Sequence, residues 1–380
     1  MLPRHHVAGK PVYTPSNLQS IITLKLMYTL ENVPLNAYST MRLGGNARYL
    51  ADVSNQFDIP KALAWADRQH LPVVMIGGGS NIYWDDNGFP GLVLVNKIEH
   101  FEKLDAGEGE AYYTIGAGEN WDSAVARTVG EGFGTLAPLS LIPGTAGATP
   151  IQNVGAYGLE ISDVLTTIQA YDSQERNFVT LRGSECNFGY RTSRFKTTDK
   201  GRYFIVAITL RVNNKPIKPP FYKALEEYFE KQGINEFTPK VVRDAVINIR
   251  TSKLPDPNVV ATNGSFFANP IVQKEFFLEL YTRHQILATW HSKWFWELPD
   301  GNYKIAVGAL MESLNLKGIH DAETGMSTWH TQSMVLINEK ATKTSQLELF
   351  RDKITDLVYK TYGIKLEQEP EKISPPTTYT

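Results

Sequence analysis

The sequence predicts an α+β protein made of three successive units. Helical and strand patterns alternate along the chain with glycine-rich turns between them, an order typical of mixed folds with a partly parallel sheet. The chain has 380 residues, of which 42% are hydrophobic and 21% charged, so it is long and apolar enough to form more than one core. This composition is that of an ordinary soluble globular protein.

The first unit is predicted to contain a helix and two strands. Asp58 is placed to cap a helix that has Pro60 in its first turn. A strand over residues 73–76 leads into the glycine turn 77–81, and a second strand follows over residues 91–96.

The second unit is predicted to form a mixed sheet. One strand ends at residues 116–118, and Asn120 can cap the helix after it. A long loop of small residues covers 143–158. Strands over 164–171 and 178–181 then form a hairpin, and a third strand covers 204–212.

The third unit is predicted to contain two long helices. Thr238 and Pro239 open the first, which must end before Pro255. Apolar residues recur at helical spacing over 347–358, and Gly363 is well placed to stop that second helix.

Several classes of function are disfavoured by the whole-chain properties. A net charge of −2 gives no large basic field for nucleic acid. The single cysteine, Cys186, excludes an internal disulfide framework and fits a reducing, cytoplasmic compartment. We find neither a secretory signal nor an apolar stretch long enough for membrane insertion, and we expect residues 1–30 to be a flexible extension with Met27 as an alternative start. The eight histidines are scattered, so no metal site is predicted.

Two glycine-rich loops are candidates for a cofactor site. Successive N–H groups in the turn 77–81 can form an anion-binding nest, although a plain tight turn explains the pattern as well. Its spacing does not match the dinucleotide-binding fingerprint. The loop 143–158 holds four glycines that let the backbone approach a flat or anionic ligand, and Gln152 and Asn153 add amide groups. The second loop therefore favours a cofactor site.

Three further features contain candidate catalytic side chains. Ser265 follows Gly264 at a tight bend, which fits either a hydroxyl directed toward a pocket or an ordinary turn residue. Arg191 lies among aromatic residues, so it could hold a carboxylate or stack on a tyrosine at the surface. Glu367 and Glu369 follow the C-terminal apolar run, where a solvated pair of charges is the ordinary interpretation.

The order of these motifs resembles that of the UDP-N-acetylenolpyruvoylglucosamine reductase family over residues 32–369. The motifs that carry the resemblance cover residues 36–45, 77–81, 116–121, 142–144, 150–158, 188–191, 253–257 and 264–267. Each motif is weak alone, and their common order makes the signal specific.

The resemblance implies a fold and a cofactor. The expected fold is a two-part FAD-binding domain of the vanillyl-alcohol-oxidase type plus a C-terminal α+β substrate-binding domain, with FAD held non-covalently. The implied organisation is an extension over 1–30, FAD-binding subdomains over 31–100 and 101–213, a substrate-binding domain over 214–362, and a tail over 363–380 that carries the active-site glutamate.

The resemblance also implies a reaction. In the family, NADPH reduces the flavin, which passes hydride to the enolpyruvyl group of UDP-N-acetylenolpyruvoylglucosamine to give UDP-N-acetylmuramate for peptidoglycan synthesis. Negative charge then develops toward the substrate carboxylate and needs a cation or a hydrogen-bond donor. By family motif, Arg191 and Glu369 stabilise this charge, and Ser265 donates a proton to the adjacent carbon.

The family motifs supply two further sets of residues. The implied FAD-binding set is Gly77, Gly78, Gly79, Ser80, Asn81, Pro143, Gly144, Gln152, Asn153, Gly155, Ala156 and Tyr157. The implied substrate-binding set is Tyr190, Tyr222, Arg250, Lys253, Asn269 and Gln332, in which Tyr222 matches the tyrosine of the longer family form loosely.

Some features depart from the family pattern or leave alternatives open. Gln368 stands between the two glutamates where the family's usual ending has proline, so Glu367 is an alternative to Glu369. The tryptophan-rich segment 290–299 either covers the pocket or belongs to a core. An FAD oxidase of the same fold and a catalytically idle nucleotide-sugar binder are alternative functions. We expect a monomer whose partners are the UDP-sugar and NADPH.

Overall fold

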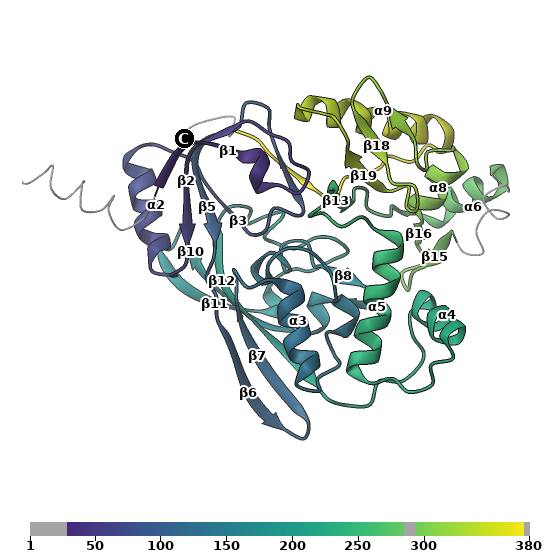
Figure 1. Ribbon diagram of the computed structural model, residues 1–380, viewed down its shortest axis with the longest axis horizontal. Helices are drawn as coiled ribbons and strands as arrows, with labels where there is room; N and C mark the ends of the chain where they lie inside the picture. The colour runs from purple at the N-terminus through teal and green to yellow at the C-terminus, as the bar shows by residue number, and fades with distance from the viewer. Residues whose placement is uncertain (1–28, 285–293, 376–380) are drawn as a thin grey trace, which may run out of the picture.

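The computed structural model describes residues 29–284 and 294–375, in which two sheets lie beside a unit of short strands and helices (Figure 1). Most of the expected N-terminal extension, Met27 and Trp290 lie outside the described residues. None of the described helices combines the length and apolarity needed to cross a bilayer.

The first unit is a four-stranded sheet in the order β1-β2-β5-β3. Its elements are β1 (Thr29–Pro34), β2 (Asn46–Val53), α2 (Asp58–Arg68), β3 (Val73–Ile76) and β5 (Phe89–Asn96), with the 3-10 helix η1 (Leu35–Tyr38) after β1. β5 pairs in parallel with both β2 and β3, which confirms the partly parallel sheet. Nearly every residue of β5 is buried, as expected for a strand covered on both faces. β1 begins within the segment expected to be an extension.

The second unit is a five-stranded sheet in the order β11-β10-β12-β7-β6, and all its pairings are antiparallel, so the predicted mixed sheet is wrong. Its elements are β6 (Phe101–Gly107), β7 (Glu110–Gly116), α3 (Trp121–Gly130), β10 (Leu165–Asp172), β11 (Asn177–Arg182) and β12 (Tyr203–Asn213). The predicted hairpin and third strand are confirmed as β10, β11 and β12.

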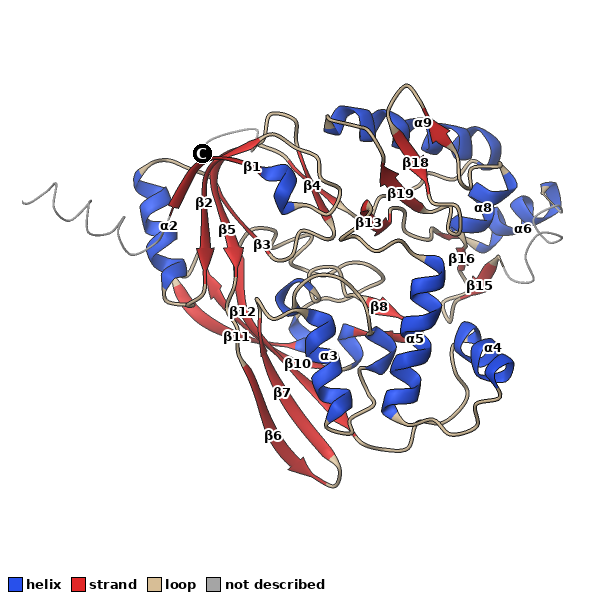
Figure 2. Cartoon of the chain, viewed as in Figure 1, coloured by secondary structure: helices blue, strands red, loops and turns tan. Residues whose placement is uncertain are grey.

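Two helices beyond residue 213 belong to the core of this second sheet. α4 (Lys223–Gln232) and α5 (Pro239–Lys253) contribute Leu225, Phe229, Val246 and Ile249 to the same apolar cluster as β7, β12 and α3. Figure 2 shows α3 and α5 side by side next to the long strands. We therefore infer a boundary of the C-terminal unit after α5 rather than at residue 214.

The described part of the C-terminal unit contains two small sheets and three helices. One sheet has β13 (Ala261–Ser265), β19 (Val335–Asn338), β18 (Met326–Thr328) and β17 (His320–Asp321), and the other has β14 (Ile271–Val272), β16 (Tyr303–Ile305) and β15 (Phe295–Glu297). The helices are α6 (Lys274–Arg283), α8 (Val307–Ser313) and α9 (Thr344–Tyr362). Trp294 is 2% exposed and packs on Phe277, so this part of the tryptophan-rich segment belongs to a core.

The tail returns to the first unit. β20 (Glu371–Ile373) pairs in parallel with β4 (Ile82–Trp84), and in Figure 1 the yellow tail runs from α9 back toward β1 and β2. The fold therefore places residues near position 370 against β4, the strand that follows the first glycine loop.

The predicted helix ends are mostly confirmed. Asn120 accepts a hydrogen bond from the Ser123 amide at 2.9 Å, Thr238 caps α5, and Gly363 ends α9 with a φ of 70°. The predicted capping by Asp58 is wrong. Asp58 is already the first helical residue, and its carboxylate pairs with Lys61 at 2.9 Å.

Candidate active site

The loop after β3 lies so close to the loop around Gly144 that side chains there would collide. A Cβ on Gly77 would lie 2.2 Å from Thr145 Oγ1, and a Cβ on Gly78 would lie 3.1 Å from Gly144 Cα. Glycine is therefore needed for the close approach of the two loops. The result is a surface made largely of backbone groups.

Polar contacts join the same two loops. Ser80 Oγ donates to the Pro143 carbonyl at 3.1 Å, and Asn81 Nδ2 donates to Gln152 Oε1 at 2.5 Å. Gly79 has a φ of 68°, and a Cβ there would lie 2.3 Å from a backbone oxygen of η1. These contacts hold two segments about 70 residues apart in one fixed arrangement.

Buried polar atoms near these loops are left unsatisfied. Thr145 Oγ1 and Arg250 Nε are buried and have no hydrogen-bond partner among the residues that the structure describes. Such atoms are uncommon in a folded protein, and they are available to hydrogen-bond with a polar ligand or an ordered water. The glycine cradle and Thr145 Oγ1 fit a cofactor that carries phosphate groups, whereas Arg250 lies beside Tyr157 and Asp122 with the predicted nucleotide residues.

The rest of the 150–158 loop is positioned by its own side chains. Asn153 is 1% exposed, and its Nδ2 donates to Glu160 Oε2 at 2.8 Å and to the Gly189 carbonyl at 3.1 Å. Its amide is thus directed into the protein, and its assignment to the cofactor stays a prediction. Ala156 lies in the β8 strand (Gly155–Ala156), and Tyr157 follows with a φ of 50°.

Arg191 and Glu369 form an ion pair across 178 residues of sequence. Arg191 Nε lies 3.2 Å from Glu369 Oε1 and from Oε2, and an Nη2 hydrogen bond to the Gly155 carbonyl at 3.0 Å fixes the guanidinium. The Arg191 and Glu369 side chains are 22% and 11% exposed. Arg191 also lies over the Tyr190 ring, with its guanidinium carbon 5.2 Å from the ring centre.

Backbone contacts select Glu369 rather than Glu367 for this position. The Glu369 amide donates to the Phe266 carbonyl at 2.9 Å, and its own carbonyl accepts from Asn81 Nδ2 at 3.2 Å and Lys196 Nζ at 3.4 Å. Glu367 is exposed and forms no ion pair within residues 29–284 and 294–375.

The environment of Glu369 raises the pKa of its carboxyl group. Burial raises the pKa of this carboxyl above its ordinary value, while Arg191 and Lys196 act in the opposite direction without cancelling the effect. The site therefore contains a carboxyl group that holds its proton more readily than an exposed glutamate does.

Ser265 is brought to the same place by its strand. It ends β13 after Gly264, which has a φ of 75°, and it is partly buried. Phe266 and Phe267 are fully buried, and Phe266 is the residue whose carbonyl accepts from the Glu369 amide. The hydroxyl-bearing segment and the glutamate-bearing segment are thus hydrogen-bonded neighbours.

A lysine that the sequence did not single out lies beside this cluster. Lys304 Nζ is 4.9 Å from the centre of the Tyr190 ring, whose hydroxyl is held by the Asn269 backbone. Burial and the nearby Arg191 both lower the pKa of Lys304. The sequence signal that could have identified Lys304 is its place between the hydrophobic residues Tyr303 and Ile305. The structure shows that both neighbours are buried in the short strand β16.

The predicted nucleotide residues lie in two groups. Arg250 is buried near Tyr157 and Asp122, and burial lowers its pKa. Tyr222, 47% exposed, packs edge-on against Tyr157 with ring centres 5.7 Å apart.

The second group joins the end of α5 to the loop before β19. Thr331 Oγ1 donates to the Lys253 carbonyl at 2.6 Å, which brings Lys253 next to Gln332. Gln332 Oε1 lies 3.5 Å from the position of a Cβ on Gly308. Asn269 caps the start of α8 by accepting from the Val307 amide at 3.0 Å.

Comparisons with known proteins show the family of this chain. The model "FAD binding domain" matches residues 47–177, and the model "UDP-N-acetylenolpyruvoylglucosamine reductase, C-terminal domain" matches residues 256–373. The UDP-N-acetylenolpyruvoylglucosamine reductase of Ralstonia nicotianae is 38% identical over 340 residues, which cover 89% of this chain and 97% of the relative. The chain belongs to the UDP-N-acetylenolpyruvoylglucosamine reductase family. The member from Cupriavidus pinatubonensis is 36% identical and covers 90% of this chain and 98% of its own.

A solved member of the reductase family has the same fold. The crystal structure of UDP-N-acetylenolpyruvylglucosamine reductase from Thermus caldophilus superposes with a TM-score of 0.62 at 19% identity and covers 91% of this chain and 99% of its own. The predicted family, the α+β fold class with its two-part FAD-binding domain, and FAD as the cofactor are confirmed. The roles of individual side chains stay predictions.

Proposed function

We propose that this family member reduces the enolpyruvyl group of UDP-N-acetylenolpyruvoylglucosamine to UDP-N-acetylmuramate with NADPH, as a cytoplasmic step of peptidoglycan precursor synthesis. The observation that carries the proposal is the buried Arg191–Glu369 pair hydrogen-bonded through the tail to the segment of Ser265. When bound, FAD supplies the hydride-transfer chemistry between NADPH and the enolpyruvyl carbon.

The cofactor would be held by the two glycine loops. Their backbone groups, Thr145 Oγ1 and the amides of Asn81 and Gln152 are the groups available for its polar parts. The UDP group would be bound by the cations Arg250 and Lys253, since guanidinium and ammonium groups suit a diphosphate.

The reacting end of the substrate would lie at the Arg191 cluster. Arg191 and Lys304 place two positive charges where negative charge develops on the substrate carboxylate. Glu369 orients the Arg191 guanidinium through their ion pair at 3.2 Å, so that this cation faces the substrate carboxylate.

Ser265 would protonate the carbon next to that carboxylate. A serine hydroxyl is a poor acid in water, but the carbanion that it protonates is strongly basic and the adjacent cations stabilise the alkoxide. The Ser265 alkoxide would regain its proton from Glu369 or from solvent before the next turnover.

The test is a two-step anaerobic titration of the purified protein. Its flavin absorbance should bleach with NADPH and return on adding UDP-N-acetylenolpyruvoylglucosamine, with UDP-N-acetylmuramate as the product. Absorbance that does not return with the UDP-sugar would refute the proposed function, and reduction of the flavin by an alcohol or amine in place of NADPH would favour the oxidase.

A further inference from the structure

Gln368 lies between Glu367 and Glu369 and forms an isolated antiparallel bridge with Phe267. Side chains two positions apart point to the same face of a strand, so Glu367 and Glu369 can exchange places if the tail slips by two residues. Such a slip preserves which face is buried. Something other than the hydrophobic pattern must therefore choose the register.

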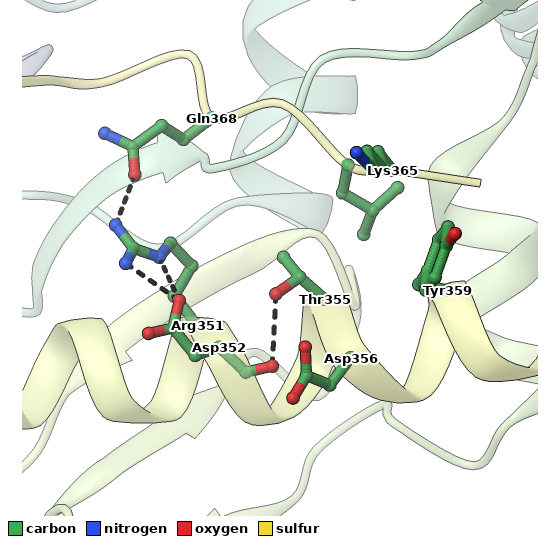
Figure 3. Close-up of a pocket in the computed structure, with 8 residues that line it drawn as sticks. Arg351, Asp352, Thr355, Asp356, Tyr359, Lys365 and Gln368 are labelled. Carbon is green, nitrogen blue, oxygen red and sulfur yellow. Dashed lines mark hydrogen bonds and ion pairs between the residues drawn. The ribbon is translucent and has the colours of Figure 1, made fainter. Parts of the chain in front are cut away.

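The Gln368 side chain makes the contacts that distinguish the two registers. Its Oε1 accepts from Arg351 Nη1 at 2.9 Å, and its Nε2 donates to the Tyr83 hydroxyl at 3.0 Å and to the Pro370 carbonyl at 2.9 Å. Figure 3 shows Gln368 and Arg351 facing one another at a surface pocket of about 370 Å³ that both residues line.

The partners of Gln368 belong to fixed parts of the molecule. Tyr83 is fully buried in β4, and Arg351 lies on α9 with its side chain 23% exposed. The Tyr83 ring also packs on Phe266, with ring centres 6.2 Å apart. Tyr83 thus contacts the segments of both proposed catalytic residues, Ser265 through Phe266 and Glu369 through Gln368.

A two-residue slip would break this network. It would bring Glu367 to Arg191 and place the apolar Leu366 against the Tyr83 hydroxyl and Arg351 Nη1. Both polar groups would then lose the amide that satisfies them, and the loss is most costly at the Tyr83 hydroxyl, because Tyr83 is fully buried.

We propose that Gln368, held by Tyr83 and Arg351, is a positioning residue that fixes the register of the tail so that Glu369 rather than Glu367 pairs with Arg191. In the native register, the Ala268 amide donates to the Glu367 carbonyl and the Glu369 amide to the Phe266 carbonyl, both at 2.9 Å. The inference rests on the proposed role of Glu369 in the reaction.

The first measurement is hydrogen–deuterium exchange of the holoenzyme, which does not depend on activity. Gln368→Leu should raise exchange at the Ala268 and Glu369 amides, because slipped or open states become populated. The matched control is Asp352→Asn, which removes the other ion pair of Arg351 at 2.8 Å and leaves the Gln368 contacts in place. Unchanged exchange in Gln368→Leu would overturn the proposal.

The second measurement tests which glutamate is used. In single-turnover reoxidation of the reduced flavin by the UDP-sugar, Gln368→Leu should slow the reaction by about tenfold or more, as expected for a buried donor left unsatisfied. Glu367→Gln should be neutral alone but should slow Gln368→Leu further, because part of that variant uses Glu367. Strict neutrality of Glu367→Gln in both backgrounds would overturn the register assignment.

A third variant covers the case in which Gln368→Leu does not fold. Tyr83→Phe removes the hydroxyl and keeps the ring against Phe266, and it should shift exchange and reoxidation in the same direction. Flavin reduction by NADPH should be unchanged throughout. If the wild type failed to react with the UDP-sugar, the proposed function would fail, whereas the exchange result would still decide the register.

Discussion

Separate replacement of the two tail glutamates tests the geometry of the active site most directly. The Glu369 side chain is 11% exposed, and both of its oxygens lie 3.2 Å from Arg191 Nε. Glu369→Gln keeps the shape of the side chain and its backbone contacts. The amide can neither carry a negative charge nor donate a carboxyl proton. Glu367→Gln makes the same chemical change on an exposed side chain two residues away.

The expected effects differ strongly in size. Removing one buried, positioned group that stabilises the charge of a transition state lowers the rate by about 10²- to 10³-fold. Glu369→Gln should therefore slow flavin reoxidation by about that factor. Glu367→Gln should change the rate by less than about twofold, as expected for a surface substitution within about 0.5 kcal/mol. Stopped-flow flavin absorbance, with NADPH reduction measured separately, gives both rates.

The pH dependence of stability gives an independent check. Because the pKa of Glu369 is raised in the folded protein, its contribution to stability is fully present below the ordinary glutamate pKa and is lost as pH rises through the raised value. Chemical denaturation at several pH values should show this loss in the wild type and its absence in Glu369→Gln.

Equal rate losses for the two variants, or a larger loss for Glu367→Gln, would refute the assignment of Glu369.

Three other substitutions test separate parts of the structure. Ser265→Ala should leave flavin reduction by NADPH nearly intact and slow reoxidation by the UDP-sugar; equal loss of both would exclude a proton-donor role. Asp172→Asn should lower the free energy of unfolding by about 3 kcal/mol, because this 3% exposed carboxylate is held by a two-pronged arginine contact. That arginine lowers the pKa of Asp172. The stabilisation of the folded protein is therefore present above the ordinary aspartate pKa and is lost as pH falls through the lowered value. A denaturation series over pH that shows no such difference between wild type and Asp172→Asn would contradict this prediction. Gly77→Ala should weaken FAD binding about tenfold, since its Cβ would lie 2.2 Å from Thr145 Oγ1, whereas Gly130→Ala, with nothing within 4 Å, should not; fluorescence titration of the apoprotein with FAD compares them.

Local signals in the sequence predicted much of the fold. The caps at Asn120 and Thr238 and the stop at Gly363 depend on the residue itself and a few neighbours, and all three are confirmed. The cap at Asp58 was wrong because the turn before it already bends the chain: the Asp58 amide donates to the Asn55 carbonyl at 3.0 Å.

The parts of the site that depend on distant contacts were harder to predict. Sequence left Glu367 and Glu369 as alternatives, since the choice depends on Arg191, Phe266 and Asn81. Lys304 was missed for the same reason, because its surroundings are formed by segments far from it along the chain. The membership of α4 and α5 in the second core also depends on tertiary packing that no local pattern reveals.

The return of the tail to β4 has a consequence for the order in which the protein assembles. Glu369 meets Arg191 across 178 residues and Asn81 across 288 residues, whereas the contact of Asn81 with Gln152 spans 71. Closing the longer loops costs more chain entropy, so the cradle for FAD can form before the carboxylate arrives. Docking of residues 366–373 is then a late step of assembly, which brings the glutamate to Arg191 after the two glycine loops have met.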